Sequence, residues 1–417
     1  MAMDNNELNL AEVIEKYPDV PRFIILKLDL QLRGVKLTDR ALEAVQDDRY
    51  RHSGISLYGT EADKASSKAD PAPAILRDGT TVVYTPGNES EDSYVIDNVD
   101  GKFLILDGEA QIEEVDFSPR PAYYGKKTSR GVPMESVANA RPQRLDITPY
   151  RYCHFWDTGH QCKYCGFFTD LREQRQVGGA QFIKVLDPED AYETVKEALK
   201  EPGRFSQIYL TAGTDYGGPK PFDNEVGRYI EVLQAIGRNF KSRRFPSQLM
   251  APAYSKAQLR RLHDETGLVS YCPDIEVLDE SLFKWICPGK EKWFGRDYWV
   301  RGALDAVDIF GWGNVYSNIV AGVETAQPHG FKAIDEALKS NLEGCEFFAR
   351  HGVQVLAVVW KPWKSSAFRG QKQPPLEYYV RLIKGFHDIK RAYGLTPDSD
   401  DYKHCGNHGD SDLARLD

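Results

Sequence analysis

The chain has 417 residues, of which 41% are hydrophobic and 28% charged, and its formal net charge is −9. This length suits one large domain with a smaller one, and the composition is that of a globular protein. No apolar run approaches the roughly 20 residues of a membrane span, and the N-terminus lacks the features of a secretory signal. The acidic balance argues against a surface that coats nucleic acid. We therefore expect a cytoplasmic protein without a membrane partner or a nucleic-acid partner.

Residues 1–140 predict a small N-terminal domain that is α+β or mostly β. A helix is expected within residues 5–17, where leucine, valine and isoleucine recur on one side. Residues 59–73 are polar and small, which predicts an exposed loop. Strands are expected over 80–85, 93–98 and 102–107, and the segment 107–117 follows them. Asp100-Gly101 and Asp107-Gly108 are hairpin signals.

Residues 141–395 alternate between strand and helix patterns, which predicts an α/β fold. Six such units follow one another, and parallel strands with helical crossovers are the arrangement they favour. We predict a partial (β/α)6 TIM-like barrel, with its ligands at the C-terminal ends of the strands. An open Rossmann-like sheet is the alternative, although no GxGxxG motif follows the first strand. Residues 396–417 are expected to form a C-terminal tail.

Three of the chain's seven cysteines lie in the loop directly after the first of these strands: Cys153, Cys162 and Cys165. In a reducing compartment, clustered cysteines more often bind metal than form disulfides. Three thiolates can hold three corners of a [4Fe–4S] cluster and leave its fourth iron open. A structural zinc site normally has four ligands, so zinc would need His154 or His160 as the fourth. Zinc and an unligated trio of thiols remain alternatives.

The loop resembles the cluster motif of radical S-adenosylmethionine (SAM) enzymes, in their biotin-synthase-like branch. The last pair of cysteines has the family's spacing, and Tyr164 is the aromatic residue that the family places before the final cysteine. The eight residues between Cys153 and Cys162 are more than the commonest family spacing, which leaves the subfamily open. The resemblance implies a [4Fe–4S] cluster on the three cysteines and SAM on the unique iron. It covers about residues 145–395.

The same resemblance implies where SAM is contacted. Tyr164 would contact the adenine of SAM, and Glu276 would contact the ribose. The backbone after the second strand would contact the amino group of the methionine part. The charged member of the second-strand motif is missing here, so only backbone contacts carry over at that place. The expected cofactor-binding residues are Tyr164, Ala212, Gly213, Thr214, Glu276, Ser317, Asn318 and, through the backbone, Val359.

The alternation of side chains along a strand also favours Glu276 as a residue that faces the bound SAM. If the fourth strand extends through "IEVL", side chains alternate and Asp274 and Glu276 share one face. Burying two carboxylates against the outer helices would be costly, so we expect both to face the barrel lumen.

The activity implied is reductive cleavage of SAM to a 5′-deoxyadenosyl radical, which takes hydrogen from a small molecule in cofactor or metabolite biosynthesis. No catalytic side chain beyond the cluster site is predicted. An electron donor such as ferredoxin or flavodoxin would supply the electron. A radical SAM enzyme that modifies RNA or a peptide is the alternative, followed by a non-catalytic iron–sulfur or zinc protein.

Several other features leave their roles open. The basic segment 120–144 is either a solvated linker or a cover over the barrel mouth that binds an anionic substrate. Cys345 is expected to pack in the core, and no role is predicted for Cys272, Cys287 or Cys405. Near the end of the chain, His404, Cys405 and His408 either touch a metal, close the base of the barrel or belong to a polar tail.

Overall fold

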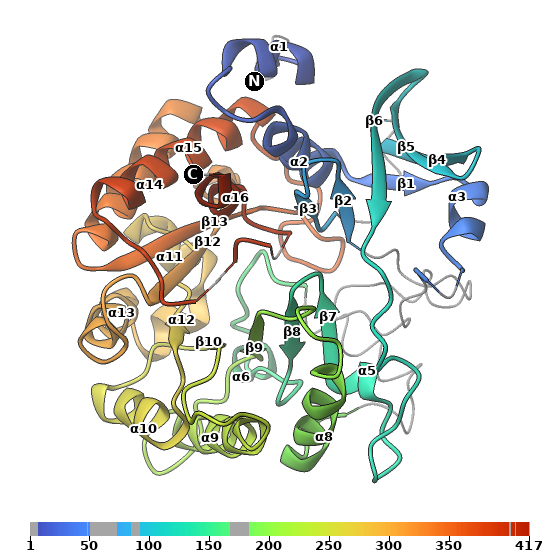
Figure 1. The fold of residues 1–417 in the computed structure, drawn as a ribbon. Helices are drawn as coiled ribbons and strands as arrows, with labels where there is room; N and C mark the ends of the chain where they lie inside the picture. The colour runs from blue at the N-terminus through green and yellow to red at the C-terminus, as the bar shows by residue number, and fades with distance from the viewer. Residues whose placement is uncertain are drawn as a thin grey trace.

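The chain folds around two β-sheets, one curled and surrounded by helices and the other smaller (Figure 1). The structure is a computed structural model and describes residues 7–47, 49–50, 73–84, 92–166, 183–399, 402–404 and 406–416. Within this part of the chain, no helix has both the length and the apolar character that crossing a membrane requires.

The curled sheet has seven strands in the order β13-β12-β11-β10-β9-β8-β7. Neighbouring strands from β8 to β13 are parallel, and β7 runs antiparallel to β8 at one edge. The strands are β7 (Ala138–Arg141), β8 (Arg144–Ile147), β9 (Gln207–Thr211), β10 (Ser247–Met250), β11 (Ser270–Cys272), β12 (Val315–Ala321) and β13 (Val353–Val359).

Helices cover the convex side of this sheet, so the fold is α/β with a partial barrel rather than the open sheet considered as the alternative (Figure 1). The helix α8 begins as predicted, with Asp187 as its N-cap and Pro188 at the first position. The covering helices are α8 (Pro188–Ala198), α9 (Asp223–Gly237), α10 (Lys256–Thr266), α13 (Arg296–Phe310), α14 (Ile334–Ala349) and α15 (Leu376–Ala392). Shorter elements are α5 (Met134–Val137), α6 (His154–Asp157), α11 (Glu280–Ile286), α12 (Pro288–Trp293) and η2 (Val323–Thr325).

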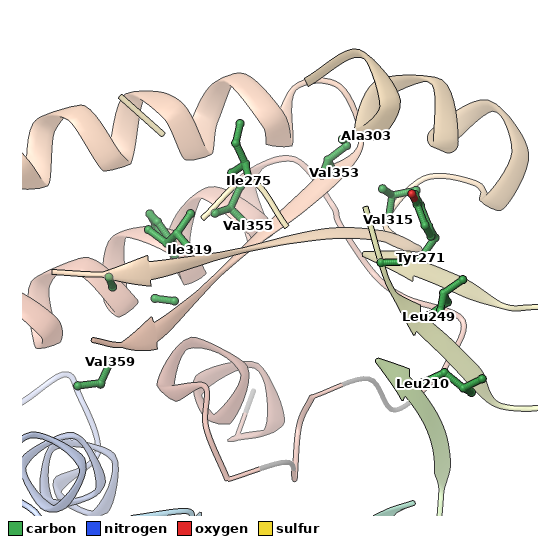
Figure 2. Packing of buried hydrophobic residues seen from close by; sticks show 14 of the residues in the cluster. Leu210, Leu249, Tyr271, Ile275, Ala303, Val315, Ile319, Val353, Val355 and Val359 are labelled. Atoms are coloured by element: carbon green, nitrogen blue, oxygen red, sulfur yellow. The ribbon is translucent and has the colours of Figure 1, made fainter. Parts of the chain in front are cut away.

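Alternation along each strand divides the side chains between two layers. On β9, Ile208 and Leu210 pack in the large cluster between sheet and helices, while Tyr209 points into the barrel. Figure 2 shows part of the outer layer, with Leu210, Leu249, Tyr271, Ile275, Ala303, Val315, Ile319, Val353, Val355 and Val359 labelled. The inner layer contains Tyr209, Cys272, Tyr316, Leu356 and Tyr402.

The second sheet has six strands in the order β1-β4-β5-β6-β2-β3 and a buried cluster of its own. Asp100 and Gly101 both have positive φ, of 51° and 81°, as a two-residue turn between antiparallel strands requires. The predicted loop over 59–73 lies almost wholly outside the described residues. The elements are β1 (Val35–Leu37), α3 (Asp39–Ala44), β2 (Ala74–Leu76), β3 (Thr81–Val82), β4 (Tyr94–Val99), β5 (Lys102–Asp107) and β6 (Ala110–Phe117).

Two N-terminal helices, α1 (Leu10–Lys16) and α2 (Arg22–Arg33), connect the sheets. Ile24 and Leu28 of α2 belong to the barrel's cluster, whereas Leu26 and Leu30 belong to that of the second sheet. The domain boundary expected at residue 140 falls inside β7, a strand of the curled sheet.

The last described residues pack into the barrel. Tyr402 belongs to the inner layer, and α16 (Gly409–Leu416) contacts α2, α15 and β13. His408 is buried there, and its pKa is lowered to about 3 by that burial. The described residues of this segment therefore close the barrel, as one of the predicted roles had it. Cys405 lies outside the described residues.

Candidate active site

The cysteine loop leaves β8 and is held against the loop that follows β9. The His154 amide donates to the Thr214 carbonyl at 2.8 Å, and the Tyr150 hydroxyl donates to the Gly213 carbonyl at 2.9 Å. A Cβ at Gly213 would lie 2.1 Å from the Tyr152 carbonyl oxygen and 2.8 Å from the Cβ of Cys153. The two loops can therefore meet this closely only because residue 213 is glycine.

The second half of the cysteine loop is fixed by backbone hydrogen bonds. The Cys165 amide donates to the Cys162 carbonyl at 3.0 Å, which closes a turn. The Lys163 amide donates to the Ile286 carbonyl at 2.9 Å, so the turn is also tied to the end of α11. The spacing of the last two cysteines thus places them at the two ends of one turn.

A cavity of about 290 Å³ opens at this end of the barrel and collects most of the predicted site residues. It is lined by all three cysteines and by Tyr164, Ala212, Gly213, Thr214 and Glu276. These residues lie in the segments that follow β8, β9 and β11. Ligands were expected at this end of the barrel. Asp274, which was expected to face the lumen, also lines the cavity. The remaining lining residues were not predicted from the sequence: Thr148, Phe155, Trp156, Gly166, Thr211, Met250, Ala251, Pro252, Lys290, Trp299 and Trp363.

The donor set suits an iron–sulfur cluster. The three thiols are partly exposed toward one cavity, whereas Cys272, Cys287 and Cys345 are buried. Among the described side chains, no three His, Cys, Asp or Glu residues converge on a point suited to a single metal ion. A cubane cluster has a different requirement, because each thiolate bonds a different iron and the ligands surround a common volume.

A fourth cysteine, distant in the sequence, touches the loop. The side chain of Cys287 is in hydrogen-bonding contact with that of Cys162. That hydrogen bond, with the nearby Lys290 cation, lowers the pKa of Cys162 against the effect of burial. Burial raises the pKa of Cys153 to about 11. Metals bind the thiolate form of cysteine. The surroundings of Cys162 therefore favour metal binding more than those of Cys153 do.

The fourth parallel strand is shorter than predicted. It ends at Cys272 and does not continue through "IEVL". Pro273 has no N–H to donate to the ladder, and the Ser317 hydroxyl takes over by accepting from the Ile275 amide and donating to the Pro273 carbonyl. The premise of alternation along a continuous strand was therefore wrong at this place.

Glu276 nevertheless reaches the cavity, by a different route. Its amide donates to the Asn318 carbonyl and its own carbonyl accepts from Val320, both at 3.0 Å, which forms an isolated bridge to β12. Its φ is +70°, a left-handed conformation that few residues other than glycine adopt. This conformation turns the carboxylate toward the cavity, where Asp274 also lies.

Lys290 on α12 meets these two acidic residues. Its Nζ lies 2.9 Å from Oε1 of Glu276 and 2.6 Å from the carbonyl oxygen of Asp274. The pKa of the Asp274 carboxyl is raised above its usual range, by burial first and then by the charge of Glu276. The sequence carries only a weak indication that Lys290 belongs to the site. A helix that packs on the cysteine loop begins at Pro288, directly after Cys287, and Lys290 lies in its first turn.

Three predicted cofactor contacts do not belong to the described lining of the cavity. Ser317 is buried on the helix side of β12, where it holds the backbone that leads to Glu276. The Asn318 amide points into the barrel toward Cys272 and Tyr402. The side chain of Val359 packs in the outer cluster.

The basic segment 120–144 packs along the barrel and is not a solvated linker. Lys126 pairs with Glu197 at 2.6 Å, and Arg130 pairs with Asp187, both on or next to α8. Arg144 pairs with Asp146 at 2.5 Å within β8. These cations have acidic partners within the chain, and the segment ends as strand β7 of the curled sheet.

The chain can be compared with known families, sequences and structures. No family model matches the chain. A bacteriochlorophyllide c C-7(1)-hydroxylase from Chlorobaculum limnaeum is 24% identical over 276 residues, which cover 64% of this chain and 65% of that relative. The match therefore spans less than two thirds of the relative.

A solved structure of a radical SAM methyltransferase from Sphaerobacter thermophilus matches with a TM-score of 0.41 and 14% identity, covering 98% of this chain and 99% of that one. This chain is therefore similar in sequence to a bacteriochlorophyllide hydroxylase, and its three-cysteine loop lies at the C-terminal ends of a curled parallel sheet.

Proposed function

We propose that this protein binds a [4Fe–4S] cluster through Cys153, Cys162 and Cys165 and cleaves SAM reductively to act on a small molecule. The observation that carries the proposal is the cavity that the three thiols share with Glu276 and the loop after β9. When bound and reduced, the cluster and SAM supply a 5′-deoxyadenosyl radical that can take hydrogen from an unactivated C–H bond.

The residues of the chain have binding and orienting roles in this proposal. Tyr164 offers an aromatic face for the adenine, the backbone at Ala212–Thr214 meets the amino group of methionine, and Glu276 accepts from the ribose hydroxyls. Ser317 acts indirectly, by holding the backbone before Glu276. Asn318 contacts the lining residue Met250 but does not itself line the described cavity, and neither does Val359, so we assign these two residues no direct contact.

Apolar and aromatic side chains form much of the remaining lining. Phe155, Trp156, Trp299 and Trp363 surround the cavity together with Met250. The indole N–H of Trp299 is buried and has no hydrogen-bond partner within the described residues. Such a lining suits a substrate with a flat apolar face and at least one acceptor atom.

The name of the matched hydroxylase points the same way, because its substrate, bacteriochlorophyllide c, is a small molecule. We propose a small-molecule substrate for this chain and a reductant such as ferredoxin or flavodoxin. The acidic balance disfavours RNA as the substrate.

Anaerobic incubation with SAM and dithionite tests this function. The reconstituted protein should release 5′-deoxyadenosine and methionine, and a Cys162→Ala variant should release neither. Protein with full iron content that leaves SAM intact would contradict the proposal. Salt-dependent RNA binding that stimulates SAM cleavage would instead favour a nucleic-acid substrate.

A further inference from the structure

A buried lysine stands beside the proposed SAM site without any role in the function stated so far. Lys290 is 6% exposed and lines the same cavity as the three cysteines. It lies on α12, which packs so tightly on the cysteine loop that a Cβ at Gly289 would come within 2.5 Å of the His160 carbonyl oxygen. An ammonium group taken out of water at such a place needs partners that compensate its lost hydration.

Lys290 contacts Glu276, Asp274 and Trp299. Its Nζ donates to Oε1 of Glu276 at 2.9 Å and to the Asp274 carbonyl at 2.6 Å, and it lies 4.6 Å from the centre of the Trp299 ring. An ammonium group has three donors. Two of the three donors form hydrogen bonds with residues 274 and 276, so the ammonium group is directed toward the segment 274–276. Its charge also faces the ring of Trp299.

That segment is held in a conformation that costs energy. Glu276 has φ +70° and is fixed by backbone hydrogen bonds to Asn318 and Val320. A residue with a side chain stays in this region only where its surroundings impose it, and such strain is concentrated at functional sites. Lys290 helps to hold this conformation, because it donates to the Asp274 carbonyl and to the Glu276 carboxylate.

We propose that Lys290 is a positioning residue that holds the Glu276 carboxylate in the orientation in which it receives the ribose of SAM. This inference rests on the proposed function, because it requires SAM in the cavity. Lys290 acts through Glu276, so loss of either side chain should remove the same contribution to SAM binding.

A double-mutant cycle on SAM affinity tests this inference. Wild type, Lys290→Met, Glu276→Gln and the double variant are loaded with iron anaerobically, and SAM binding is measured calorimetrically with the cluster oxidised. Each single variant should bind SAM about tenfold more weakly, and the double variant should bind no more weakly than either single one. Iron content should be equal in all four proteins.

Lys390→Met provides the matched control. Lys390 is also 6% exposed and pairs with Asp410 at 2.6 Å, but it does not line this cavity. The control should lose stability and keep its SAM affinity. If Lys290→Met fails to load iron, Lys290→Gln keeps a donor for the Asp274 carbonyl and takes its place in the cycle.

The outcomes are distinct. Unchanged SAM affinity in the Lys290 variant would overturn the positioning role. Losses that multiply in the double variant would also overturn it, because Lys290 would then contact SAM independently. If the iron-loaded wild type binds no SAM at all, the proposed function fails first and the positioning role falls with it.

Discussion

At the scale of single residues, the candidate site depends on how closely two loops approach each other at Gly213. The cysteine loop and the loop after β9 leave no room for a side chain there. The His154 amide donates to the Thr214 carbonyl and the Tyr150 hydroxyl donates to the Gly213 carbonyl at the same place. The position of Cys153 relative to the cavity therefore depends on this glycine.

We expect Gly213→Ala to lose more than half of its iron after reconstitution, because the added methyl group forces the loops apart at a cost of roughly 1–3 kcal/mol. Iron content per chain is the measurement. Gly227→Ala is the control, since Gly227 is inside α9 with no atom within 4 Å of its missing Cβ, and alanine there should be neutral or stabilising. Full iron content in Gly213→Ala would show that the close approach does not matter for the cluster.

The sequence pointed to the site residues that belong to a local motif and missed those that meet it from elsewhere. The spacing of Cys162 and Cys165 corresponds to one turn, and that geometry is local. Cys287 and Lys290 reach the site only because α12 packs on the cysteine loop. Such a contact depends on the path of the chain between distant segments, which no local pattern determines.

At the scale of elements, a buried carboxylate ties the loop after β9 to a helix. Glu225 of α9 accepts the Asp215 amide at 2.6 Å and also bonds the Tyr254 hydroxyl. Burial raises the pKa of Glu225 to about 8, although its hydrogen bonds act in the opposite direction. The side chain therefore binds a proton in the folded protein at neutral pH.

This raised pKa predicts a pH dependence of stability. A carboxyl whose pKa is higher in the folded state stabilises the fold fully below its unfolded pKa of about 4.5, and that contribution is lost as the pH rises toward 8. Glutamine copies the protonated side chain and does not titrate. Unfolding of Glu225→Gln and wild type should be compared at pH 5 and pH 8.

The Glu225→Gln variant should gain stability relative to wild type between these two pH values. Other buried acids titrate in both proteins and cancel in the difference. The groups around residue 225, namely Tyr150, Tyr229, Tyr254 and Asp215, are also unchanged. A difference in unfolding free energy that is constant from pH 5 to pH 8 would show that Glu225 is already ionised.

The strand β11 shows why element boundaries were harder to predict than the elements. The apolar run around residues 269–278 predicted one strand, but Pro273 interrupts its hydrogen bonding and Ser317 on the neighbouring strand replaces the missing link. The prediction that Glu276 faces the lumen reached the observed placement for a wrong reason. Its orientation comes from a left-handed backbone and a bridge to β12.

At the scale of the whole molecule, the two ends of the chain are joined by a buried ion pair. Lys27 of α2 contacts Asp412 of α16, and both side chains are almost fully buried. The Gln31 amide also donates to the Gly406 carbonyl at 2.9 Å. This contact holds the last helix against the barrel and against the helix that leads to the second sheet.

We expect Lys27→Met to lower the free energy of unfolding by about 3 kcal/mol, because Asp412, whose pKa is already raised by burial, would lose its buried partner and keep Arg415 as its one ion-pair partner among the described residues. The double variant Lys27→Met, Asp412→Leu should recover most of the loss. Lys284→Met, which breaks an exposed pair with Glu280, should change stability far less, because water and salt screen that pair. Urea unfolding measures all three, and equal losses in the buried and exposed variants would contradict this account.

The order of elements in the barrel was predictable from the repeated strand and helix patterns, because each unit is local and its connection is short. The packing of residues 402–404 and 406–416 into the barrel was not predictable, since their polar composition is typical of a tail. Their acidic residues are buried against lysines of α2 and α15, which are far away in the sequence. Long-range pairing of opposite charges leaves no local pattern.

The central claim is that Cys153, Cys162 and Cys165 hold a [4Fe–4S] cluster with one iron open to SAM. Electron paramagnetic resonance of the anaerobically reduced protein, with and without SAM, tests it most directly. The account predicts about four irons per chain, a signal of a reduced [4Fe–4S] cluster that changes when SAM is added, and loss of that signal in Cys153→Ala, Cys162→Ala and Cys165→Ala. Stoichiometric zinc without visible absorption, or a cluster signal that SAM leaves unchanged, would contradict it.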